Sequence, residues 1–115
     1  MEIQKDPDGF NRLLVTAPEF DAEFEVYGSC PMQGFGTVRG RELYFRARHD
    51  RWSFDVADHA GRLPSDGSQE SDGYYREDAY PDAGWMPLSE AVAIIERCLA
   101  EYTAGRQQGA GERRK

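Results

Sequence analysis

The sequence predicts an α+β domain in which an antiparallel sheet of four to five strands, connected as a β-meander, packs against one C-terminal helix. Three observations support this fold class: apolar and polar residues alternate between residues 20 and 56, two tight-turn signals interrupt that region, and one apolar stripe of helical period follows it. The 115 residues fit one domain. We therefore expect one globular unit over residues 1–104 and a disordered basic tail over residues 105–115.

The first expected strands precede residue 28. A DPDG turn signal at residues 6–9 is followed by a short apolar run at residues 13–15, which we interpret as a strand. From Phe20 the alternation is regular, because Phe20, Ala22, Phe24 and Val26 point to one side, while three acidic residues and Tyr27 point to the other. Residues 28–31 then end the strand, since Pro31 cannot donate a hydrogen bond to a neighbouring strand.

Two hairpins follow between residues 34 and 56. A turn at Arg39-Gly40 would place Phe35 opposite Tyr44, because glycine readily adopts the positive φ of such turns. A turn at Asp50-Arg51 would place Arg46 opposite Asp55. The core-facing side would then contain Val38, Leu43, Phe45, Ala47, Trp52, Phe54 and Val56, with Gly34 and Gly36 leaving room beside Phe45. The other side would contain Phe35, Thr37, Tyr44, Arg46, Arg48, Ser53 and Asp55.

A helix closes the predicted domain. Its apolar stripe contains Leu88, Ala91, Val92, Ile95, Cys98, Leu99 and Tyr102. Pro87 suits the first turn and Gly105 suits the C-terminal cap. Cys98 is therefore expected in the core, where it would be unreactive. The residues after Gly105 include no apolar side chain larger than alanine, which predicts the disordered tail.

The net charge of −7 limits the classes of partner. An acidic domain repels nucleic acids and membrane surfaces at long range and attracts basic surfaces, so we expect a protein partner with a basic surface, no direct nucleic-acid binding and no membrane. Neither a disulfide framework nor an apolar N-terminal run is present among the 115 residues, which predicts a reduced, cytoplasmic protein. The sequence does not predict an oligomeric state.

The segment from Tyr74 to Trp85 is the first candidate binding site. It combines four large aromatic rings with three carboxylates, and aromatic residues often anchor protein interfaces. The candidate partner-binding residues, which include one acid from the preceding loop, are Asp72, Tyr74, Glu77, Asp78, Tyr80 and Asp82. The alternative is that rings such as Tyr75 and Trp85 only close the edge of the core.

A second candidate is the outward side of the predicted hairpins, with Tyr44, Arg46 and Arg48. Aromatic and arginine side chains together on a sheet can stack single-stranded bases and neutralise phosphates, so this face could bind single-stranded nucleic acid or a small ligand. The structural alternative is that Arg46 pairs with Asp55 and that arginine stems cover Tyr44.

No catalytic, metal or cofactor site is predicted. Asp66, Ser68, Glu70, Asp72 and Glu77 have the spacing of a calcium-binding loop, but Ser71 occupies the position where that loop needs glycine. His49 and His59 have no further imidazole or thiolate at ligand spacing. Because no nucleophile has an oriented base, we do not expect an enzyme; Cys30 is the candidate nucleophile if the chain is one.

The stretch GTVRGRELYFRARHDRWSF resembles small bacterial and phage-borne proteins. In general character the chain is similar to acidic inhibitors that phages and mobile elements direct against host defence, including anti-CRISPR proteins, and to immunity proteins of toxin systems. This resemblance implies an inhibitor that places carboxylates where a nucleic-acid-binding partner expects phosphates, or that covers a functional surface of that partner.

Overall fold

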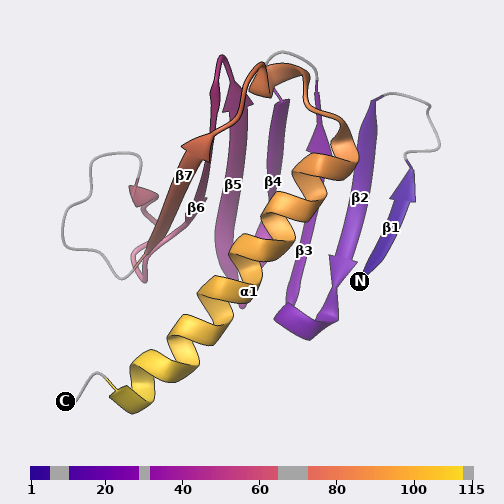
Figure 1. Cartoon of the computed structure of the whole chain (residues 1–115). Helices are drawn as coiled ribbons and strands as arrows, with labels where there is room; N and C mark the ends of the chain where they lie inside the picture. Colours follow the sequence, from indigo (N-terminus) through magenta and orange to yellow (C-terminus); the bar gives the residue numbers. More distant parts are fainter. Residues whose placement is uncertain (6–10, 29–31, 65–72, 113–115) are drawn as a thin grey trace.

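The chain forms a seven-stranded antiparallel sheet with one long helix lying across one of its faces (Figure 1). The structure is a computed structural model that describes residues 1–5, 11–28, 32–64 and 73–112, with side chains up to Gly105. The strands follow one another in chain order across the sheet, as a β-meander does. They are β1 (Glu2–Lys5), β2 (Arg12–Ala17), β3 (Ala22–Tyr27), β4 (Met32–Val38), β5 (Arg41–Arg48), β6 (Arg51–Val56) and β7 (Tyr74–Ala79), and the helix is α1 (Leu88–Glu112).

The α+β class, the antiparallel sheet and the C-terminal helix are confirmed, but the predicted number of strands is wrong. The prediction of four to five strands missed the two edge strands, β1 and β7. All residues of β1 are exposed, and β7 is exposed except for its first residue, Tyr74. An edge strand pairs on one side only and here buries little, so neither segment shows the apolar alternation that reveals a half-buried strand.

The two hairpins differ in how well the sequence predicted them. The β4–β5 turn is at Arg39-Gly40, both with positive φ, and Phe35 lies opposite Tyr44 as expected. The β5–β6 turn is at His49-Asp50 rather than Asp50-Arg51, so the predicted pairing of Arg46 with Asp55 is wrong. Tyr44 faces Asp55 instead. The error is two residues, and because side chains alternate with a period of two, it leaves both predicted faces unchanged.

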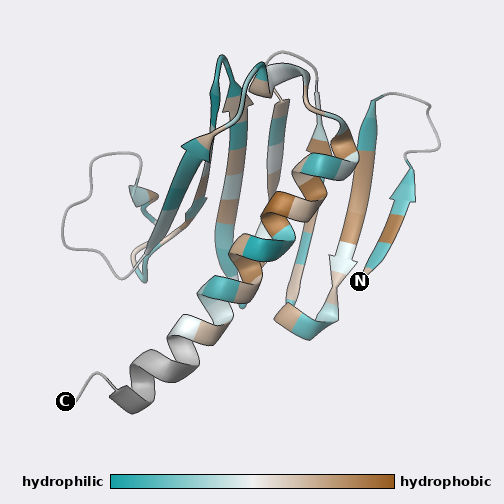
Figure 2. Cartoon of the chain, in the orientation of Figure 1, coloured by the Kyte–Doolittle hydropathy of each residue, from teal (hydrophilic) through white to brown (hydrophobic). Residues whose placement is uncertain are grey.

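The hydrophobic core lies between the sheet and α1. All seven apolar residues predicted for the core-facing side of the hairpins are buried, and Phe45 and Phe54 are fully buried. The predicted helical stripe packs against them, with only Leu88 partly exposed, and Figure 2 shows apolar and polar residues alternating along the helix. Gly34 makes room for Phe45, since a Cβ at Gly34 would lie 3.3 Å from the Cβ of Phe45.

The C-terminal helix is longer than the sequence predicted. Its backbone continues past Gly105 to Glu112, so Gly105 is not its C-terminal cap and the helix enters the segment for which a disordered tail was expected. Gly105 is exposed, and a Cβ added there would meet no atom within 4 Å. In the part of the chain that the structure describes, no helix combines the length and apolar character needed to cross a membrane.

We predict that Phe45→Ala and Ile95→Ala each lower the free energy of unfolding by about 2–5 kcal/mol, because each leaves a cavity at a fully buried position. Chemical denaturation followed by circular dichroism measures this loss. Ala93, which is exposed on α1, provides a control through Ala93→Ser. A loss below about 1 kcal/mol for either core variant would contradict the assignment of these residues to the core.

We predict that Gly105→Ala raises the free energy of unfolding by about 0.5–1 kcal/mol, because alanine is favoured over glycine inside an exposed helix. The same substitution would be unfavourable at a left-handed C-terminal cap, where glycine is preferred. Thermal and chemical denaturation of the two proteins distinguish these cases. A less stable variant would show that the helix ends at Gly105 after all.

Candidate functional site

The face of the sheet opposite α1 is the candidate site, and no described helix covers it (Figure 1). We call it the open face. Tyr27, Phe35 and Tyr44 lie side by side at its centre on β3, β4 and β5, with ring centroids 5.9 Å apart for the first pair and 5.0 Å for the second. We call these three residues the aromatic cluster. Phe35 is 40% exposed, which is unusual for a phenylalanine in the middle of a sheet.

The strand register arranges the open face in rows that run across the strands. The middle row consists of Gln4, Leu14, Glu25, Phe35, Tyr44, Asp55 and Tyr75. On one side of it is a row of Glu2, Thr16, Glu23, Thr37 and Glu42. On the other side is a row of Arg12, Tyr27, Gln33, Arg46, Ser53 and Glu77, followed by Arg48 and Arg51. Glu2, Glu23 and Glu42 therefore lie on one side of the middle row and most arginines on the other, whereas Glu77 lies in the row with the arginines.

Some charges of the open face are paired within the chain and others are not. Arg12 pairs with Glu25 at 3.4 Å, and Arg51 pairs with Glu77 at 3.3 Å. In contrast, the described residues provide no ion-pair partner for Glu23, Glu42, Arg46 or Arg48. Opposite charges thus remain available on the two sides of the aromatic cluster.

Burial affects three polar groups of the open face, which are Asp55, Tyr75 and Tyr27. Asp55 is completely buried although it belongs to the open face, where Tyr44 and Tyr75 are its partners on the adjacent strands. Tyr75 donates a hydrogen bond of 2.8 Å to Glu77, and burial together with this carboxylate raises the pKa of Tyr75. Burial and the charge of Glu25 likewise raise the pKa of Tyr27. Both hydroxyl groups stay protonated at neutral pH; Tyr75 donates its proton to Glu77, and Tyr27 can donate its own to another group.

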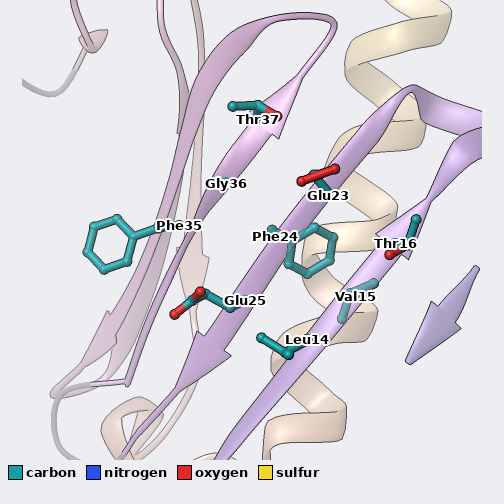
Figure 3. A pocket seen from close by; sticks show the side chains of 9 residues that line it. All are labelled: Leu14, Val15, Thr16, Glu23, Phe24, Glu25, Phe35, Gly36 and Thr37. Carbon is teal, nitrogen blue, oxygen red and sulfur yellow. The ribbon is translucent and has the colours of Figure 1, made fainter. Parts of the chain in front are cut away.

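A shallow groove of about 320 Å³ lies over β2, β3 and β4 (Figure 3). Its polar lining consists of Thr16, Glu23, Glu25 and Thr37, and Phe35 stands at its border. Gly36 is part of the same lining, and a side chain there would overlap the carbonyl oxygen of Glu23 and come within 2.5 Å of the Cα of Phe24. The groove therefore depends on a glycine that lets β3 and β4 approach closely.

The candidate segment before and within β7 does not form one surface. Tyr74 points toward α1, where its ring lies 5.5 Å from Tyr102 and its hydroxyl donates a 3.0 Å hydrogen bond to Glu101. Burial and the hydrogen bond to Glu101 raise the pKa of Tyr74 to about 12. Tyr80 also packs against the core and donates to Glu90 at 3.2 Å. These two rings therefore connect β7 and the segment after it to the helix.

The acids of that segment lie in different places. Glu77 is on the open face, whereas Asp78 is exposed on the other side of β7 and accepts a hydrogen bond from the backbone of Ala79 at 2.8 Å. Asp82 has a left-handed backbone in the turn after β7. Asp72 lies outside the described residues. Of this candidate set, only Glu77 is placed on the open face.

The second candidate set is brought together on the open face. Tyr44 belongs to the aromatic cluster, Arg46 is half-buried beside it on β5, and Arg48 is exposed at the end of the strand. Strand alternation predicts Phe35 on this face, but it does not predict that Tyr27 lies beside Phe35. Strand alternation had assigned Tyr27 to the side opposite the core, but the pairing of β3 with β4 could not be derived across residues 28–31.

Other predictions have mixed outcomes. Cys98 is buried in the core as expected, and burial raises its pKa to about 12. Tyr75 and Trp85 do not close the core, since they are 42% and 66% exposed. Cys30 and residues 66–72 of the calcium-like spacing lie outside the described residues. Within the described ranges, no three histidine, cysteine or acidic side chains form a group that could hold a metal ion.

Comparison with known proteins found no matching family model, no matching curated protein and no matching solved structure.

We predict that Gly36→Ala destabilises the protein by more than about 2 kcal/mol, because the new methyl group would overlap the backbone of β3. Chemical denaturation measures this loss. Gly40→Ala is the control for backbone strain without steric overlap, because open space surrounds Gly40 and only its positive φ opposes the substitution. Equal stability of Gly36→Ala and the wild type would contradict the close approach of β3 and β4.

Proposed function

We propose that this chain is a protein-binding module and that the open face of its sheet is the contact surface. The observation that carries the proposal is the aromatic cluster, in which Phe35 is 40% exposed between two tyrosines. Aromatic residues and arginine are enriched in protein interfaces, and hot-spot residues lie near the centre of the contact. The cluster has this central position, and Arg46 lies next to it.

The charged residues around the aromatic cluster indicate which charges the surface of the partner carries. The groove beside Phe35 presents the carboxylates of Glu23 and Glu25, and a basic group of a partner could enter it. Arg46 and Arg48 would face acidic groups on the other side. An inhibitor that covers a basic, nucleic-acid-binding surface of another protein is the form of this function that the overall charge of −7 favours, and a toxin-immunity protein is a related form.

Binding of single-stranded nucleic acid is the second candidate function. Three adjacent rings on a sheet with an arginine beside them favour it, because bases stack on such rings. The acidic row on the same face and the net charge of −7 oppose it, since phosphate contacts supply most of the affinity for nucleic acids. We therefore rank it below protein binding.

We predict that a photo-crosslinking amino acid at Phe35 forms crosslinks to protein in cells that express the chain, because position 35 would lie inside the interface. The same amino acid at Arg97, which is exposed on α1, is the matched control and should give much weaker crosslinks. Denaturing electrophoresis and mass spectrometry of the products measure the difference. Crosslinks to RNA or DNA instead of protein would support the second candidate function.

The proposal would be wrong if position 35 gave no protein crosslinks above those of position 97. A second variant checks that the open face is not needed for folding. Phe35→Ser removes the exposed ring and should leave the melting temperature within a few degrees of the wild type, because the ring is already partly in water. It should also abolish protein binding.

A further inference from the structure

We propose that the partner of the open face is a second copy of this chain, so that two sheets pack face to face with α1 on the outside of each. This inference rests on the proposed function and names the partner. It comes from the separation of unpaired charges on the open face, because a face with acids on one side and arginines on the other can be complementary to itself.

The rows of residues on the open face define the two-fold symmetry of the proposed dimer. A two-fold axis that lies in the interface and runs along the middle row would place the acidic side of one copy over the arginine side of the other. Glu42 would then face Arg46 of the second copy. Glu42 is exposed and Arg46 is half-buried, and neither has an ion-pair partner among the described residues of its own chain. Within one chain they are about 13 Å apart along β5, which is too far for a direct ion pair.

Three further opposed pairs are compatible with this arrangement. The pairs that would meet across the interface are Thr16 with Arg12, Glu23 with Tyr27, and Thr37 with Gln33. None of them brings like charges together, and the hydroxyl of Tyr27 can donate to Glu23. Glu25 lies near the axis, but its charge is already paired with Arg12 in its own copy. The separation of charge has exceptions, because Glu77 lies in the row with Arg46 and the turns contain Arg39 and Asp50. Arg48 would meet the turn at Arg39-Gly40 of the second copy, where Arg39 carries the same charge.

The centre of the contact would be aromatic. Phe35 and Tyr44 lie on the middle row, so each would meet the same residues of the second copy and lose its contact with water. Seven strands spaced about 4.8 Å apart make a face about 30 Å wide, with a flat area of roughly 600 Å². This is close to the area of about 800 Å² that each partner contributes to an interface of standard size.

Charge reversal with mixing tests the proposal. Sedimentation velocity of the wild type at about 100 µM should show twice the monomer mass. Glu42→Arg and Arg46→Glu should each raise the dissociation constant of the dimer at least about tenfold, because each creates two like-charge contacts. An equimolar mixture of the two variants should recover the dimer, since both contacts between unlike copies are then attractive.

Glu96→Arg and Arg97→Glu on α1 are matched controls that should remain dimeric.

The mixture separates a lost contact from a damaged fold, because two misfolded variants would not restore each other. If either variant fails to fold by circular dichroism, Phe35→Lys is the second test, since it places two like charges at the axis and should also give monomers. A wild type that stays monomeric at about 100 µM would overturn the proposal. A dimer that persists in the open-face variants, or folded variants that do not associate when mixed, would overturn it as well.

These outcomes are distinct from failure of the proposed function. A monomeric wild type that still crosslinks from position 35 to another protein would remove the second copy as partner and leave the protein-binding function standing. Absence of crosslinks from position 35 together with a monomeric wild type would refute both.

Discussion

One helix covers one face of a seven-stranded sheet, and the other properties of the molecule follow from this constraint. The core can form only between α1 and the face that holds Phe45 and Phe54, so the core-facing residues of the central strands are apolar except Arg41 at the start of β5. The alternate residues form the open face, where most of them are exposed or half-buried and Asp55 is completely buried. Aromatic side chains in that second set are not needed for the core, which is why Phe35 and its neighbours identify the open face as the candidate site.

Short-range features of the chain hold this arrangement in register. The turn at Arg39-Gly40 sets the pairing of β4 with β5, and Gly36 allows the backbone of β3 to approach β4 closely. At the far edge, the hydroxyls of Tyr74 and Tyr80 bond to acids of α1 and attach β7 to the helix. Arg76 also pairs with Glu101 of α1 and lowers the pKa of that carboxyl group. These contacts fix the register of the strands, and a fixed register places the residues of the open face in rows.

The sheet thus combines two surfaces with different chemistry. The covered side holds the apolar core, while the open side has an aromatic centre between acids and arginines. The net charge alone favours a basic partner, but the arrangement of charges on one face favours a partner with both signs in a matching order. Spatial order of charge, rather than its sum, is therefore the more specific information for recognition.

The sequence by itself determined which residues face the core, because alternation has a period of two and the helical stripe a period near 3.6. It also determined the first hairpin through Arg39-Gly40 and the buried position of Cys98. Only the tertiary structure decided the pairing of β3 with β4, the two edge strands and the burial of Asp55, because each depends on contacts between distant segments. The aromatic cluster was thus only partly predictable: strand alternation placed its members outside the core, but long-range register brought Tyr27 beside Phe35.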